Sequence, residues 1–95
     1  MTQPGGLHVI VCGRVQGVGF RRFVERLALQ LDVAGWVANL PDGSVEVVAD
    51  GPSGSIQRLL AALREGPPGA VVRELRTPTE PPRAPADRPF RVRRS

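Results

Sequence analysis

The stretch Gly13-Arg14-Val15-Gln16-Gly17-Val18-Gly19-Phe20-Arg21 decides the fold and the chemistry expected of this 95-residue chain. It joins an apolar, β-branched run over residues 7–12 to a segment whose apolar residues recur at helical spacing. Glycine lets a backbone turn and approach a ligand closely, and the first N–H groups of a helix have no intrahelical partner. An arginine in the first helical turn adds a planar fork of donors that matches a phosphate. The stretch therefore predicts an anion-binding loop between a strand and a helix.

The segments on either side of this loop follow the periods of a strand and a helix. In residues 7–12, Leu7, Val9 and Val11 alternate with His8, Ile10 and Cys12, as in a strand with two different faces. After the loop, apolar residues recur along one helical stripe: Phe20, Phe23, Val24, Leu27, Ala28 and Leu31.

The middle of the chain predicts a hairpin and a second helix. Residues 33–40 and 44–50 are typical of two strands joined through Pro41-Asp42-Gly43. In the second strand, the pattern places Val45, Val47 and Ala49 inward and Glu46 and Asp50 outward. The second helix is expected to take Ser53 or Ser55 as its N-cap and to end at Gly66 and Pro67.

The remaining segments complete the predicted fold. Residues 71–76 favour a fourth strand, residues 78–89 a proline-rich loop, and residues 90–93 a short closing strand. The order predicts an α+β protein, a ferredoxin-like sandwich (βαββαβ) in which two helices pack on one face of an antiparallel sheet, plus a short C-terminal strand. We expect a single domain over residues 1–95, with residues 1–6 flexible.

Composition restricts the chemistry. The net charge is +4, and all thirteen basic residues are arginine. Without lysine, the chain has no Schiff-base lysine, no phosphate-loop lysine and no lysine general base. A single cysteine, Cys12, rules out an internal disulfide. Because we find neither a secretion signal nor an apolar run of membrane-spanning length, we expect a cytoplasmic protein.

Several familiar sites are excluded by their motifs. The glycines from Gly13 to Gly19 follow G-x-x-x-G-x-G, which is neither a Walker loop nor the dinucleotide fingerprint, and Val18 stands where a cysteine phosphatase loop needs arginine. His8 and Cys12 are the only nitrogen and sulfur ligands, so we expect no metal site and interpret His8 as a surface group. These exclusions favour a site that binds a phosphoryl group with backbone donors and one arginine and acts by positioning.

A second motif completes the pattern: Gly35-Trp36-Val37-Ala38-Asn39, followed by Gly43, Val45 and Gly51. With it, the chain resembles the acylphosphatase family. The family pattern G-x-V-Q-G-V-x-F-R matches residues 13–21, and G-W-V-x-N-x-x-x-G-x-V with a following glycine matches residues 35–51. The resemblance covers nearly the whole chain and implies the same ferredoxin-like sandwich.

The resemblance implies hydrolysis of the carboxyl-phosphate bond of acyl phosphates to a carboxylate and inorganic phosphate, without metal or cofactor. It implies that Arg21 binds the phosphate and that Asn39 orients the attacking water, a role suited to an amide that both accepts and donates hydrogen bonds. We expect a monomer that binds neither nucleic acid nor membrane. The residues implied to cradle the phosphate are Val15, Gln16, Gly17, Val18, Gly19, Phe20 and Arg21.

Two other functions stay open. One is a ferredoxin-like RNA-binding domain, although such domains stack bases on aromatic residues of central strands and residues 44–50 contain none. The other is a non-catalytic module that binds acyl or carbamoyl phosphate within a larger enzyme.

Individual residues also have simpler interpretations. Arg21 is spaced to pair with Glu25 at i+4, and Asn39 suits the turn that follows it. We expect Gln16 to satisfy loop carbonyls and Trp36 to lie in the core. Cys12 is expected to be a small, buried or half-buried apolar residue.

Overall fold

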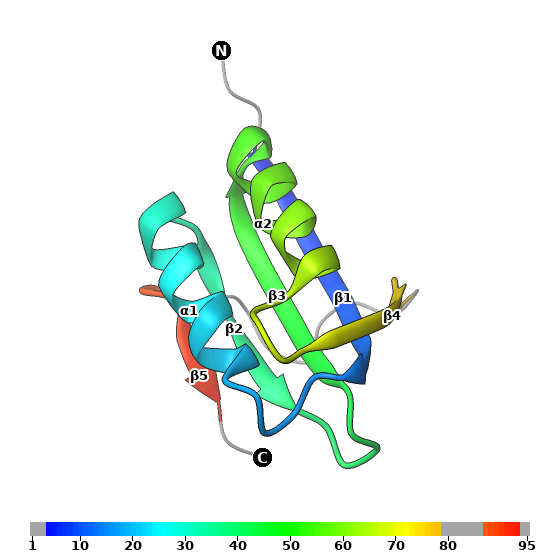
Figure 1. The fold of residues 1–95 in the computed structure, drawn as a ribbon. Coiled ribbons are helices and arrows are strands. Elements are labelled where there is room, and N and C mark those ends of the chain that lie inside the picture. The colour runs from blue at the N-terminus through cyan, green and yellow to red at the C-terminus, as the bar shows by residue number, and fades with distance from the viewer. Residues whose placement is uncertain (1–3, 79–86, 94–95) are drawn as a thin grey trace.

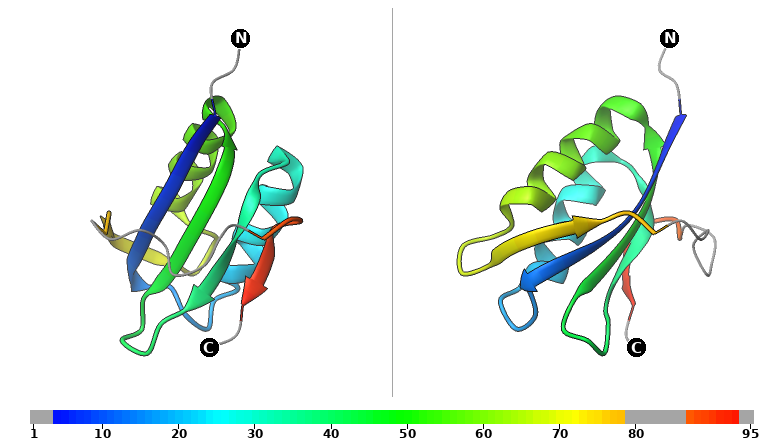
Figure 2. Two further views of the ribbon diagram at one scale, coloured as in Figure 1. Left: turned by 180° about the vertical axis from the view of Figure 1, so that it is seen from behind. Right: turned by 90° about the vertical axis from the view of Figure 1, so that its right-hand side faces the viewer.

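The computed structural model describes residues 4–78 and 87–93 and shows two helices packed on a five-stranded sheet (Figure 1). Both helices cover the same face of the sheet, as Figure 2 shows from two further sides. The elements in chain order are β1 (Pro4–Arg14), α1 (Phe20–Leu31), β2 (Ala34–Asn39), β3 (Val45–Pro52), α2 (Ser53–Glu65), β4 (Val71–Arg76) and β5 (Arg91–Arg93).

The predicted ferredoxin-like sandwich with a short C-terminal strand is confirmed. The strand order is β4-β1-β3-β2-β5, and the first four strands of that order are antiparallel neighbours. The short strand β5 lies parallel to β2, with Val92 opposite Val37. The five-stranded sheet is therefore mixed rather than wholly antiparallel.

Most element bounds lie within two residues of the predicted ones, and β1 differs most. Helix α1 and strand β4 have the predicted bounds. Strand β1 starts earlier than expected, because residues 4–6 pair with Pro52, Gly51 and Asp50 although we expected residues 1–6 to be flexible. Residues 1–3, and residues 79–86 of the expected proline-rich loop, lie outside the described residues.

The start of α2 corrects a prediction. Neither Ser53 nor Ser55 is its N-cap: Pro52 takes that position, at φ −58° and ψ 141°, and no side chain caps the helix. The extended dihedrals of Pro52 already suit a residue that precedes a helix, since proline fixes φ near this value. The predicted end is confirmed, because Gly66 closes α2 and its N–H donates to the carbonyl of Ala62 at 2.8 Å.

The core lies between the helices and the inner face of the sheet. In β1 and β3 the predicted alternation is confirmed, since Val9, Val11, Val45, Val47 and Ala49 are at most 2% exposed. The helices add one stripe each to this core: Phe20, Val24 and Ala28 from α1, and Ile56, Leu59 and Leu63 from α2. Each large side chain buried in this way stabilises the fold by about 1.5–3 kcal/mol.

On the other face of the sheet, Glu46, His8 and Trp36 are all more buried, or buried in other surroundings, than the sequence indicated. Glu46 points to this face as expected, yet its side chain is only 8% exposed, and its carboxylate lies 2.7 Å from Nε2 of His8. His8, which we expected at the surface, is itself only 14% exposed. Trp36 is buried as predicted, but in a separate small cluster with Ala38 and Val48 rather than in the main core.

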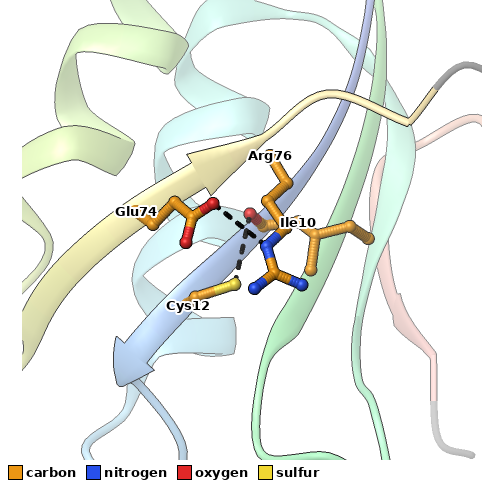
Figure 3. A network of polar contacts seen from close by, with 4 residues as sticks. All are labelled: Ile10, Cys12, Glu74 and Arg76. Carbon is orange, nitrogen blue, oxygen red and sulfur yellow. Dashed lines mark hydrogen bonds and ion pairs between the residues drawn. The ribbon is translucent and has the colours of Figure 1, made fainter.

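Strand β4 lies at one edge of the sheet and pairs with the end of β1. Figure 3 shows the polar contacts there: Nε of Arg76 donates to Glu74 at 3.1 Å, and the thiol of Cys12 lies 4.0 Å from the carbonyl oxygen of Ile10. Arg76 and Glu74 are largely exposed, so their ion pair contributes little to stability. Cys12 is half-buried, as predicted.

Candidate active site

The loop between β1 and α1 depends on two glycines in the left-handed region. Gly17 has φ 75° and Gly19 has φ 78°, values that other residues adopt at a cost of roughly 1–2 kcal/mol. A Cβ added at either position would meet no atom within 4 Å, so the backbone conformation and not crowding calls for glycine. Gly19 is also the N-cap of α1, and no side chain caps the helix there. The N–H groups of the first turn are thus available to an anion.

Gln16 fastens this loop to the turn between β2 and β3. Its Nε2 donates to the carbonyl oxygens of Leu40 and Ser44, each at 2.8 Å. The expectation that Gln16 satisfies loop carbonyls is confirmed. The side chain holds the glycine loop beside the end of β2, where Asn39 lies.

The turn itself is closed by hydrogen bonds. The N–H of Leu40 donates to Ser44 at 2.9 Å, and the N–H of Gly43 donates to Leu40 at 3.1 Å. Both the hydroxyl and the N–H of Ser44 donate to the carboxylate of Asp42, and these bonds hold the pKa of Asp42 below its usual value. The turn fixes the point at which β2 ends, directly after Asn39.

A cavity of about 540 Å³ lies where the loop, the first turns of α1 and the ends of β2 and β5 meet. It brings the two predicted catalytic residues, Arg21 and Asn39, together with the glycines of the loop. The residues that line it are Val15, Gly17, Gly19, Phe20, Arg21, Arg22, Glu25, Asn39 and Val92.

The structure disfavours the simpler interpretation of Arg21. The ion pairs found within residues 4–78 and 87–93 join His8 to Glu46, Arg76 to Glu74 and Arg93 to Asp87. The guanidinium of Arg21 therefore does not pair with Glu25, although both residues line the same cavity. The guanidinium of Arg21 is thus not held by an ion pair with its neighbour on the helix.

Asn39 carries an amide oxygen that the fold leaves without a partner. Its Oδ1 is buried, and no hydrogen-bond donor reaches it from the part of the chain that the structure describes. Buried polar atoms are nearly always hydrogen-bonded, so this oxygen is an exception, as are Nδ1 of His8 and Nε1 of Trp36. Of these three residues, Asn39 is the one that lines the cavity.

Two of the residues predicted to cradle the phosphate lie outside the cavity lining. Gln16 and Val18 do not line the cavity: the side chain of Gln16 is bonded to the turn, and that of Val18 packs against the core. Three lining residues were missed by the sequence analysis, namely Arg22, Glu25 and Val92. Arg22 and Glu25 follow from the helical spacing around Arg21, whereas Val92 reaches the site only through the pairing of β5 with β2.

Two contacts anchor β5 beside β2. The carbonyl of Asp87 accepts from the N–H of Gly35 at 2.6 Å. Arg93 donates to both carboxylate oxygens of Asp87, at 2.9 and 2.8 Å, and its guanidinium lies 4.7 Å from the ring centroid of Trp36. This hydrogen-bonded guanidinium holds the pKa of Asp87 below its usual value, and the pair holds Val92 at the cavity.

The described residues contain no group of three or more histidine, cysteine, aspartate or glutamate side chains placed to hold a metal ion. Neither of their helices has the length and apolar character needed to cross a membrane.

Comparison with known proteins identifies the family. A sequence profile described as acylphosphatase matches residues 7–92. An acylphosphatase from Gloeobacter violaceus is 53% identical over 75 residues, which cover 79% of this chain and 81% of the relative.

Solved structures agree with this assignment. The structure of an acylphosphatase from Coxiella burnetii has a TM-score of 0.81 at 43% identity and covers 98% of this chain and 100% of its own. The chain is also similar to 12% of the larger T. kodakarensis HypF structure, with a TM-score of 0.78, 34% identity and 96% of this chain covered. The chain belongs to the acylphosphatase family, which consists of hydrolases that act on acyl phosphates.

Proposed function

We propose that this protein hydrolyses acyl phosphates to a carboxylate and inorganic phosphate, with Arg21 binding the phosphoryl group and Asn39 orienting the attacking water. One observation carries the proposal: Arg21, Asn39 and the glycine loop line a single cavity. The family membership supplies the reaction, and the geometry supports the roles of the residues.

The phosphoryl group is bound by positive charge and backbone donors. The guanidinium of Arg21 matches two phosphoryl oxygens, while the N–H groups of residues 15–21 donate to the same group. In phosphoryl transfer, charge is spread over the three equatorial oxygens in the transition state. Gln16 fixes the loop by its hydrogen bonds to the turn, so the backbone donors are in place before the reaction. Such donors stabilise the charge of the transition state without having to reorganise.

Asn39 acts on the nucleophile. Its orphaned Oδ1 accepts a hydrogen bond from the water, and its amide N–H₂ donates to a phosphoryl oxygen, which places the water in line with the bond to be broken. The water oxygen bonds to phosphorus as the phosphorus–oxygen bond to the acyl group breaks. The electron pair leaves with the carboxylate, and the water proton passes to the phosphate product or to solvent.

The mechanism needs neither a strong base nor a metal ion. A carboxylate is a good leaving group, so orientation and charge stabilisation supply most of the catalysis. Arg21 and the backbone amides provide the positive charge that a metal supplies in other phosphoryl transfers. We propose that the protein acts as a monomer in the cytoplasm.

The RNA-binding alternative loses support. Ferredoxin-like RNA-binding domains stack bases on exposed aromatic rings of the sheet. Here the aromatic residue of that face, Trp36, is 3% exposed, and the guanidinium of Arg93 lies over its ring.

The chain is similar to a short stretch of HypF, so one alternative stays open, namely a non-catalytic binding module within a larger enzyme. Such a module would bind an acyl phosphate without turnover. The presence of Arg21 and Asn39 in one cavity favours turnover instead.

Hydrolysis of acetyl phosphate in ¹⁸O-labelled water, with a metal chelator present, tests the proposal. We expect chelator-insensitive turnover with the label in inorganic phosphate and none in acetate, because the water attacks phosphorus. Label in acetate would show attack at the carbonyl carbon. Binding without turnover would instead identify a binding module.

A further inference from the structure

A second cavity, of about 620 Å³, lies between α1 and α2. Its lining is mostly apolar, and the phosphate chemistry described above makes no use of it. The apolar part consists of Phe23 and Leu27 from α1, Ala62 from α2, and Pro67 and Pro68 from the loop that follows α2. We refer to these five residues as the interhelical groove.

The groove adjoins the candidate active site. Gly19 and Arg22 line both cavities, so the two meet at the first turn of α1. In Figure 1, α2 lies beside α1, while β5 belongs to the sheet, next to β2. Asn39 and Val92 line only the cavity next to β5, whereas the groove lies on the side next to α2.

This arrangement matters because of the geometry of phosphoryl transfer. The attacking and leaving oxygens lie roughly in line on opposite sides of phosphorus. If Asn39 holds the water on its side of the bound phosphoryl group, the acyl group leaves on the side away from Asn39. Gly19, which has no side chain, and Arg22 lie where the groove adjoins the cavity that Asn39 lines.

We propose that the interhelical groove binds the acyl group of the substrate and makes the enzyme selective for acyl phosphates with an apolar chain. The proposal rests on the proposed function, because it takes the roles of Arg21 and Asn39 as given. An acyl phosphate with an unbranched alkyl chain is the substrate class that this apolar groove fits.

The groove would act mainly on binding. An alkyl chain far from phosphorus makes the same contacts in the ground state and in the transition state, so it lowers KM and leaves kcat nearly unchanged. Each methylene transferred from water to an apolar site improves binding by about fourfold when fully buried, and by about twofold in an open groove.

The direct test measures kcat and KM of the wild-type protein for acetyl, butyryl and hexanoyl phosphate. These substrates share nearly the same leaving group, so their intrinsic reactivity does not differ. We expect kcat/KM to rise about tenfold or more from acetyl to hexanoyl phosphate, through a fall in KM. Equal kcat/KM values for the three substrates would overturn the proposal.

Two neighbouring alanines of α2 provide a matched pair of variants. Ala62 lines the groove, whereas Ala61 is exposed on another face of the helix. Filling the groove with Ala62→Phe should lower the hexanoyl-to-acetyl ratio of kcat/KM about tenfold, and Ala61→Phe should keep the wild-type ratio. A ratio that both variants retain would place the acyl group elsewhere.

The outcomes separate this inference from the proposed function. If acetyl phosphate is not hydrolysed at all, the proposed function fails. If acetyl phosphate is hydrolysed but chain length has no effect, only the groove assignment fails. The wild-type series needs no variant, so it decides the matter even if Ala62→Phe does not fold.

Discussion

At the scale of single residues, the proposed mechanism depends on two polar side chains for which the fold provides no partner among the described residues. Arg21 forms no ion pair within the described part of the chain, and Oδ1 of Asn39 is buried there without a donor. A fold optimised only for stability would satisfy such an acceptor, because an unpaired buried polar group costs about 1–3 kcal/mol. Asn39 carries this structural cost, and it lines one cavity with Arg21, a combination that is typical of functional sites.

The first prediction concerns Asn39. Asn39→Ala removes the group that orients the water, and we expect kcat for acetyl phosphate to fall about 10²- to 10³-fold, as for the loss of one preorganised donor. The thermal midpoint should stay the same or rise, because the substitution removes a buried oxygen that has no partner. Gln57→Ala, which truncates an exposed amide on α2, serves as the control and should retain wild-type turnover. Full activity in Asn39→Ala would remove this residue from the mechanism.

At the scale of elements, the start of α1 is the feature on which the site depends. Gly19 caps the helix in the left-handed region, and the first turn separates the phosphate cavity from the interhelical groove. The side chain of Gln16 fixes the preceding loop against the turn after β2. The proposed anion site is therefore held by backbone conformation and one amide side chain.

The second prediction compares two glycines. Gly19→Ala places a Cβ in the left-handed region, so we expect the free energy of unfolding to fall by about 1–2 kcal/mol, with reduced activity as the loop adjusts. Gly54→Ala, in the first turn of α2, has equally open space and no positive φ, and should be neutral or stabilising by up to about 1 kcal/mol. Urea denaturation of both variants gives these differences. Equal effects would show that left-handed geometry is not what selects glycine at position 19.

Periodicity predicted most elements because their patterns are local. Helix α1 has a continuous apolar stripe, so its bounds follow from the sequence. The N-cap of α2 does not follow from the sequence. Serine is a favoured N-cap residue, but Pro52, whose backbone is extended, takes that position. Alternation likewise showed which face Glu46 points to, yet it gave no sign that His8 would meet it there.

At the scale of the whole molecule, the site is assembled from distant parts of the chain. The loop, α1, β2 and β5 each supply part of the cavity lining. The roles of Arg21 and Asn39 were proposed from two separate motifs, and the structure brings both residues to one cavity. The contribution of Val92 could not be predicted, because it depends on the parallel pairing of β5 with β2.

The third prediction concerns the anchor of β5 in acid. Arg93 lowers the pKa of Asp87 in the folded state below the ordinary value of 3.8. A lowered carboxyl pKa stabilises the fold above the unfolded-state pKa, and this contribution is lost as the pH falls through the folded-state pKa. We therefore expect Asp87→Asn to lower the thermal midpoint at neutral pH, and the gap from wild type to close below pH 3.8.

Thermal denaturation of both proteins between neutral pH and the acid range measures this gap. Asp42, whose pKa is lowered by Ser44, is unchanged in the variant and accounts for part of the acid sensitivity that stays. A constant gap across the pH range would contradict the role of the Asp87 charge.

The most direct measurement of the central claim is the rate of acetyl phosphate hydrolysis by Arg21→Ala and wild type, side by side, in the presence of a chelator. Arg58→Ala, which removes an exposed arginine of α2, controls for the loss of one positive charge. We predict that Arg21→Ala loses about 10²- to 10³-fold in kcat/KM and that Arg58→Ala stays close to wild type. Unchanged turnover in Arg21→Ala would contradict the claim that this guanidinium binds the phosphoryl group.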